Sequence, residues 1–63
     1  MEHTSYRLIP FSDRRPRIHD TVEEVRRAAW AMREKNKGYY MYEVTEQDGK
    51  RRMTMLGGWN PRV

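Results

Sequence analysis

Two clusters of basic side chains have the chemistry to contact a polyanion. Guanidinium and ammonium groups bind phosphate oxygens, and such contacts position a nucleic acid without reading its sequence. Thirteen basic and nine acidic residues give the chain a net charge of +4, which favours anionic partners. The candidate nucleic-acid-binding residues are Arg14, Arg15, Arg17, Lys50, Arg51 and Arg52. A solvated charge shell, with arginines paired to carboxylates, explains the same residues equally well.

A tryptophan among arginines is the second candidate site. On a helix through this segment, Trp30 lies about 130° from the middle of the apolar stripe, on the charged side. Tryptophan and arginine are the residues enriched at interface hot spots. The candidate protein-binding residues are Trp30, Arg26, Arg27 and Arg33. The alternative is structural: the Trp30 ring packs against the N-terminal segment or the tail around Trp59, stacked under an arginine.

Residues for catalysis or metal binding are scarce. The chain has no cysteine and only two histidines, His3 and His19, so a zinc site would need carboxylates that have structural uses. No glycine-rich loop precedes a helix, and the adjacent Glu23 and Glu24 suit the start of a helix better than acid–base chemistry. We therefore expect a non-enzymatic protein with no catalytic residues, no metal and no cofactor.

The segment from residue 39 to 59 is expected to form a β-hairpin. Asp48-Gly49 between two β-rich runs predicts a two-residue type I′ turn, which also fixes the register. The expected pairs are Gln47 with Lys50, Glu46 with Arg51, Thr45 with Arg52, Val44 with Met53, Glu43 with Thr54, Tyr42 with Met55, Met41 with Leu56 and Tyr40 with Gly57. Directly opposed side chains share a face. The face that collects Tyr40, Tyr42, Val44, Met53 and Met55 is expected to be the core, and the other face is expected to meet solvent.

A helix from about Thr21 to about Asn36 is expected to cover this hairpin. Thr21 or Asp20 is the candidate N-cap, each with a glutamate three residues later. Gly38 is the expected left-handed stop. At 100° per residue, a narrow apolar stripe forms along one side. Its members are Val22, Val25, Ala29 and Met32, with Ala28 beside them.

The remaining strand is expected at Tyr6–Ile9, closed by Pro10, and is followed by a basic surface connector, Arg14 to Arg17. The fold class is therefore α+β, in the order β-α-β-β, with one helix on a three-stranded, mainly antiparallel sheet. Two arrangements remain open. The first strand lies either antiparallel beside Met53–Leu56 or parallel beside the first hairpin strand. Residues 1–63 are expected to form a single domain, with 1–4 and 60–63 as frayed tails.

The pattern as a whole predicts a small basic binding module. It resembles many small phage and bacterial α+β proteins, a likeness of architecture that implies an accessory role on a larger machine and transfers no functional residue. No segment is apolar enough for a membrane helix or a signal-peptide core, which predicts a cytoplasmic protein with no membrane partner. Nucleic acid is the leading expected partner. A protein partner, bound as a modulator or inhibitor, is the alternative, and so small a core also favours a homodimer.

Overall fold

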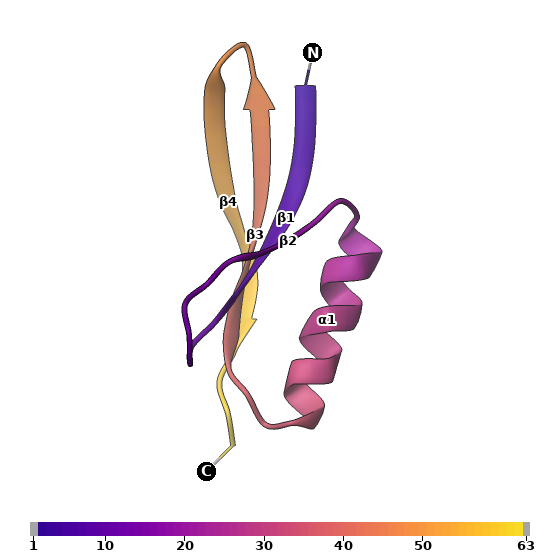
Figure 1. The fold of residues 1–63 in the computed structure, drawn as a ribbon, viewed down its shortest axis with the longest axis vertical. Coiled ribbons are helices and arrows are strands. Elements are labelled where there is room, and N and C mark those ends of the chain that lie inside the picture. Colours follow the sequence, from indigo (N-terminus) through magenta and orange to yellow (C-terminus); the bar gives the residue numbers. More distant parts are fainter. Residues whose placement is uncertain (1, 63) are drawn as a thin grey trace.

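Four antiparallel strands and one helix make up the fold in the computed structural model, which describes residues 2–62 (Figure 1). The elements are β1 (Glu2–Pro10), β2 (Arg17–His19), α1 (Val22–Glu34), β3 (Tyr39–Gln47) and β4 (Lys50–Trp59). The sheet order is β2-β1-β3-β4, and every neighbouring pair is antiparallel. The α+β class and the single helix are confirmed.

The predicted three-stranded topology is wrong, because the connector contains a strand. Arg17 belongs to β2, which pairs with β1 and reverses the chain before the helix begins. As a result α1 runs alongside β1, and β3 then pairs with β1 in the antiparallel direction (Figure 1). The first strand therefore lies beside the first hairpin strand, as one arrangement proposed, but in the opposite direction.

Both ends of the described chain make specific contacts. Residues 2–4, expected to be frayed, extend β1 and pair with Thr45–Gln47. At the other end, the Asn36 side-chain amide donates to the Arg62 carbonyl, and its oxygen accepts from the Arg62 amide, both at 2.8 Å. Residues 1 and 63 of the predicted tails lie outside the described residues.

The hairpin turn and most of its register are confirmed. Asp48 and Gly49 have φ values of +52° and +77°, as a type I′ turn requires. The pairs from Gln47 with Lys50 through Tyr42 with Met55 are as predicted. Beyond them a β-bulge leaves Leu56 unpaired, so Met41 pairs with Gly57. The extra residue reverses the alternation of faces in the rest of β4 and brings Trp59 opposite Tyr39.

Thr21 is the N-cap of α1. Its hydroxyl accepts from the Glu24 amide at 3.2 Å, while the Glu24 carboxylate accepts from the Asp20 amide at 3.1 Å. Of the two candidate caps, the structure uses Thr21. The Thr21 hydroxyl thereby satisfies one of the amide groups that the first helical turn leaves without partners, and the Glu24 carboxylate holds the residue before the cap.

The helix ends two residues earlier than predicted, and its stop is Asn36 in place of Gly38. Asn36 has a φ of +56°, its amide donates to Arg33, and the Lys37 amide donates to Met32, which is a Schellman motif. Gly38 is glycine for another reason. A Cβ there would overlap the Phe11 ring, whose backbone amide donates to the Gly38 carbonyl at 3.0 Å.

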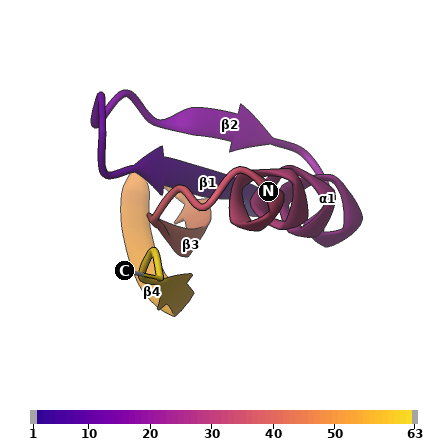
Figure 2. The same ribbon diagram turned by 90° about the horizontal axis from the view of Figure 1, so that it is seen from below.

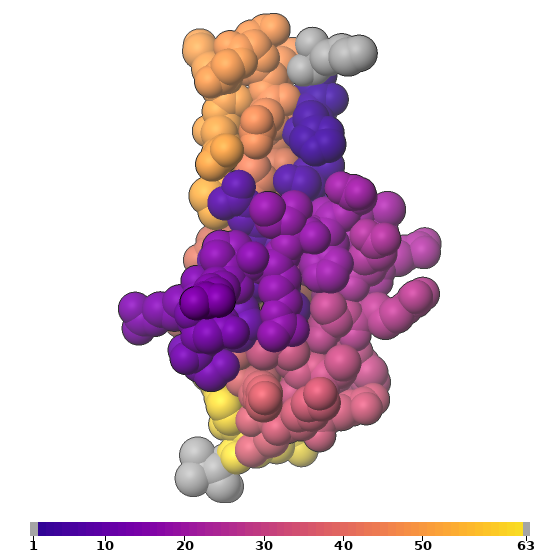
Figure 3. Space-filling view, viewed as in Figure 1, coloured from indigo at the N-terminus to yellow at the C-terminus, as the bar shows by residue number. Residues whose placement is uncertain are grey.

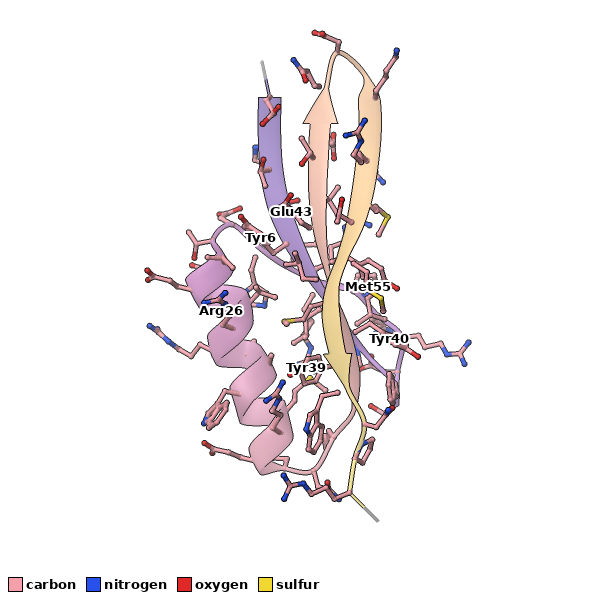
Figure 4. All side chains as sticks on the ribbon, turned by 180° about the vertical axis from the view of Figure 1, so that it is seen from behind. Tyr6, Arg26, Tyr39, Tyr40, Glu43 and Met55 are labelled. Atoms are coloured by element: carbon pink, nitrogen blue, oxygen red, sulfur yellow. The ribbon has the colours of Figure 1, made fainter. Side chains whose placement is uncertain are left out.

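The core lies on the opposite face of the hairpin from the one predicted. Tyr39 and Met41 face α1, together with Leu8 of β1, whereas Tyr40 and Met55 lie on the side away from the helix (Figure 4). The main core cluster is Leu8, Val25, Ala29, Met32 and Tyr39. The hairpin alone has more apolar residues on its other face. The face toward α1 becomes the core because β1 adds Leu8 to it and the bulge turns Trp59 to the same side.

The helix covers only part of the sheet. The chain is elongated, with extents of 43 × 19 × 16 Å. One half contains α1 and the β1–β2 loop, and the other is a narrow ribbon of β1, β3 and β4 around the hairpin turn (Figures 1 and 3). Viewed along the long axis, α1 lies on one side of the sheet near β1, and β4 is a free edge (Figure 2). No helix among residues 2–62 is long and apolar enough to cross a membrane.

Candidate aromatic–arginine site

One arginine lies among three aromatic rings beside the helix. The guanidinium carbon of Arg33 is 5.9 Å from the ring centroids of Trp30, Tyr39 and Trp59. Its Nε donates a hydrogen bond of 2.8 Å to the Tyr39 hydroxyl. Cations are attracted to the faces of aromatic rings at this range. We call these four residues, Trp30, Arg33, Tyr39 and Trp59, the aromatic–arginine site.

The helix supplies one wall of this site. Arg26, Trp30 and Arg33 are spaced i, i+4 and i+7, so they form a ridge along one side of α1. The ridge flanks the buried stripe on the side of β3, because Arg26, Trp30 and Arg33 line a hollow together with Tyr39 and Met41. The helix packs its apolar stripe against Leu8 of β1, and this packing fixes the direction in which the ridge points.

The hairpin supplies the other wall. Tyr39 and Trp59 are a cross-strand pair at the end of the hairpin next to the helix C-terminus. Without the bulge at Leu56, Trp59 would point to the opposite face of the sheet. Tyr39 is 1% exposed, so the hydroxyl that accepts from Arg33 is fixed by a buried ring. The guanidinium is therefore held in one orientation.

Two adjoining hollows open onto the site. The first is about 250 Å³ and lies between the helix ridge and β3, next to Ala29 and Met41. The second is about 290 Å³ and lies between Trp30 and Trp59, with Arg62 on its border. Trp30 and Arg33 line both hollows, and Trp30 is 62% exposed. The site thus offers an aromatic surface and a cationic group to the same ligand.

The site belongs to an end of the molecule that is rich in basic groups. The β1–β2 loop, the helix C-terminus and the C-terminal tail meet there, because Phe11 is hydrogen-bonded to Gly38 and Arg62 to Asn36. We call this the basic end. Its charged residues are Arg14, Arg15, Arg33, Lys35, Lys37 and Arg62, all exposed, against Asp13 and Glu34.

The hairpin end has a different charge balance. Lys50, Arg51 and Arg52 line a broad hollow of about 770 Å³ that also contains Glu2, Glu43 and Asp48. Arg51 is already paired with Glu46 at 3.4 Å. Basic groups at this end therefore have acidic groups beside them, as a solvated charge shell would have.

The six predicted nucleic-acid-binding residues are not brought together. Arg14 and Arg15 follow the last residue of β1, whereas Lys50 to Arg52 lie beside its first residue, and a nine-residue strand spans about 26 Å. Arg17 is exposed in β2, opposite Leu8. Arg14 and Arg15 thus belong to the basic end, Lys50 to Arg52 belong to the hairpin end, and Arg17 lies between them.

The predicted protein-binding residues are largely assembled. Arg26, Trp30 and Arg33 line one hollow, and Arg27 lies outside it on the outer side of the helix. Tyr39, Trp59 and Arg62 complete the surroundings. Trp59 was named in the structural alternative for Trp30, whereas Tyr39 and Arg62 were not predicted. Two consecutive glycines, Gly57 and Gly58, are the signal that could have revealed the bulge.

Among residues 2–62, no group of three or more His, Asp or Glu side chains is placed to hold a metal ion. No family model matches the chain, and no curated protein and no solved structure matches it. The site must therefore be interpreted from its own chemistry.

Proposed function

We propose that the protein binds single-stranded nucleic acid at its basic end, with bases stacked on Trp30 and Trp59. The observation that supports this most is the position of Arg33, 5.9 Å from both indole rings and hydrogen-bonded to Tyr39. Single-strand binders combine exposed aromatic rings with a basic surface that follows the backbone. Here the rings and the excess of positive charge occur at the same end of the chain.

Each part of the site has a defined role in this proposal. The exposed face of Trp30 stacks on a base, a contact worth about 1–3 kcal/mol per base. Arg33 is held by Tyr39, so it adds a cation next to the stacked base without losing further side-chain entropy. Arg14, Arg15 and Arg62 contact phosphates. Because phosphate contacts carry no base information, binding is only weakly dependent on sequence.

Tryptophan fluorescence tests the proposal directly, because Trp30 and Trp59 are the chain's two tryptophans. Titration with a single-stranded oligonucleotide at low salt is expected to quench the emission, with an affinity that falls as salt rises. Trp30→Ala is expected to weaken binding by about tenfold or more, whereas Trp30→Phe, which keeps a ring, loses less. Circular dichroism checks that both variants fold. The absence of binding at low salt would refute the proposal.

A protein partner is the second candidate, favoured by the exposure of Trp30. An indole that is 62% exposed beside Arg26 and Arg33 matches the anchor of an interface hot spot. In this case the partner offers an acidic rim around an apolar pocket, and the arginines mainly raise the rate of association. The same titration separates the two candidates, because this one predicts no oligonucleotide binding.

A further inference from the structure

The face of the sheet turned away from α1 is apolar and uncovered. Its largest exposed side chains are Ile18 at 63%, Met55 at 53%, Met53 at 47% and Tyr40 at 43%. The register places Ile18, Arg7, Tyr42 and Met55 in one row across all four strands. The adjacent row contains Val44, which is fully buried between Ser5 and Met53. We call this surface the open face, and it is separate from the aromatic–arginine site.

We propose that the open face is the interface of a homodimer, in which two copies pack these faces against each other. The four exposed side chains alone present on the order of 400 Å² of apolar surface, the size of the largest apolar patch of a typical monomer, which is often functional. Two sheets packed in this way lie about 10 Å apart and interdigitate their side chains.

The total surface of the chain exceeds that of a compact monomer of the same mass. The described chain has an accessible surface of 5122 Å², whereas a compact monomer of 7.7 kDa is expected to have about 4300 Å². The excess is about 800 Å², and both the elongated shape and the uncovered open face contribute to it. The open face is its largest apolar element.

The charges on the open face suit a second copy of the same chain. Arg51 and Glu46 neutralise each other there at 3.4 Å, and Arg52 lies on the helix side of the sheet. Two arginines remain. Arg14 lines a hollow with Ile9 and Tyr40 at the border of the open face. Arg7 lies in the middle of the apolar row, and its Nε is buried with no hydrogen-bond partner among residues 2–62. The chain itself already covers this Nε, so a second copy contacts only the exposed part of the Arg7 side chain.

The oligomeric state of the wild-type protein is the first test. Sedimentation velocity from about 1 µM to about 1 mM is expected to show a monomer converting to a dimer. Met55→Lys is expected to raise the dimer dissociation constant at least about tenfold. Thr54→Lys is the matched control, because Thr54 is the next residue of β4, is also exposed, and lies on the helix side opposite Glu43. A wild-type protein that remains monomeric overturns the proposal.

Cysteine cross-linking then locates the interface, since the chain contains no cysteine. Met55→Cys is expected to form a covalent dimer with a bismaleimide whose arm spans about 10 Å, the separation of two packed sheets, and Thr54→Cys is not. A dimer that cross-links through Thr54→Cys instead would place the contact on the helix side or at the free edge of β4 and overturn this assignment. Failure of both variants to cross-link, together with stable binding of a different protein through Met55, would also overturn it.

Discussion

At the scale of single residues, side-chain chemistry and backbone conformation act together at Asn36. Its left-handed φ of +56° ends the helix, and its side chain holds Arg62 by two hydrogen bonds. The sequence predicted a left-handed stop in this region but assigned it to Gly38, since glycine adopts this conformation most readily. Gly38 is needed instead for the approach of Phe11. The left-handed conformation is needed at Asn36 and the missing side chain at Gly38, only two positions apart. The sequence alone does not show which residue meets which requirement.

Substitutions of Asn36 distinguish the backbone from the side chain. Asn36→Gly removes the hydrogen bonds to the tail but tolerates the left-handed conformation, whereas Asn36→Ala removes them and strains the backbone as well. The free energy of unfolding of the alanine variant is therefore expected to be about 1 kcal/mol lower than that of the glycine variant. Urea denaturation measures the difference. Equal stabilities would show that the left-handed conformation is unimportant here.

At the scale of elements, the helix cap and the hairpin turn could be predicted from the sequence, whereas the pairing of β1 and the face that packs on the helix could not. Thr21 and Asp48-Gly49 act through local hydrogen bonds and local φ values, which short patterns encode. The three-residue strand β2 has no periodicity to detect, and it alone reverses the direction of β1 relative to β3. The choice of core face depended on Leu8, which lies outside the hairpin, and on the bulge, whose signal within the hairpin is the pair Gly57-Gly58.

The bulge gives a prediction at this scale. Deletion of Leu56 would let Gly57 follow Met55 directly and retain all nine existing pairs between β3 and β4, including Tyr39 with Trp59. The variant is expected to fold, to keep its free energy of unfolding within about 1 kcal/mol of wild type, and to keep the emission maximum of Trp59 in a Trp30→Phe background. The matched deletion of Met41, opposite the bulge, shortens a strand that has no extra residue. It therefore shifts Tyr39 and Tyr40 out of register with both β1 and β4 and is expected to be far more damaging. Equal damage from the two deletions would contradict the described register.

At the scale of the whole molecule, the +4 net charge is unevenly distributed. The basic end has six basic and two acidic residues, whereas the hairpin end has three basic residues, Lys50 to Arg52, and four acidic ones. The acidic residues of the hairpin end are Glu2, Glu43, Glu46 and Asp48. The folded chain concentrates positive charge by bringing the β1–β2 loop next to the helix C-terminus. Of the two predicted basic clusters, the Arg14–Arg15 loop lies at the same end of the molecule as the aromatic–arginine site, although Arg14 lines a hollow with Tyr40 on the face away from α1.

The salt dependence of single-stranded oligonucleotide binding in two double variants tests the central proposal most directly. Arg14→Gln with Arg15→Gln and Lys50→Gln with Arg52→Gln each remove two positive charges, at opposite ends of the molecule. We expect the first pair to weaken binding and to reduce the slope of log affinity against log salt by about 1.4, the value for two phosphate contacts on a single strand. The second pair is expected to leave the slope unchanged. A loss confined to the hairpin variant, or an equal loss in both, would contradict binding at the basic end.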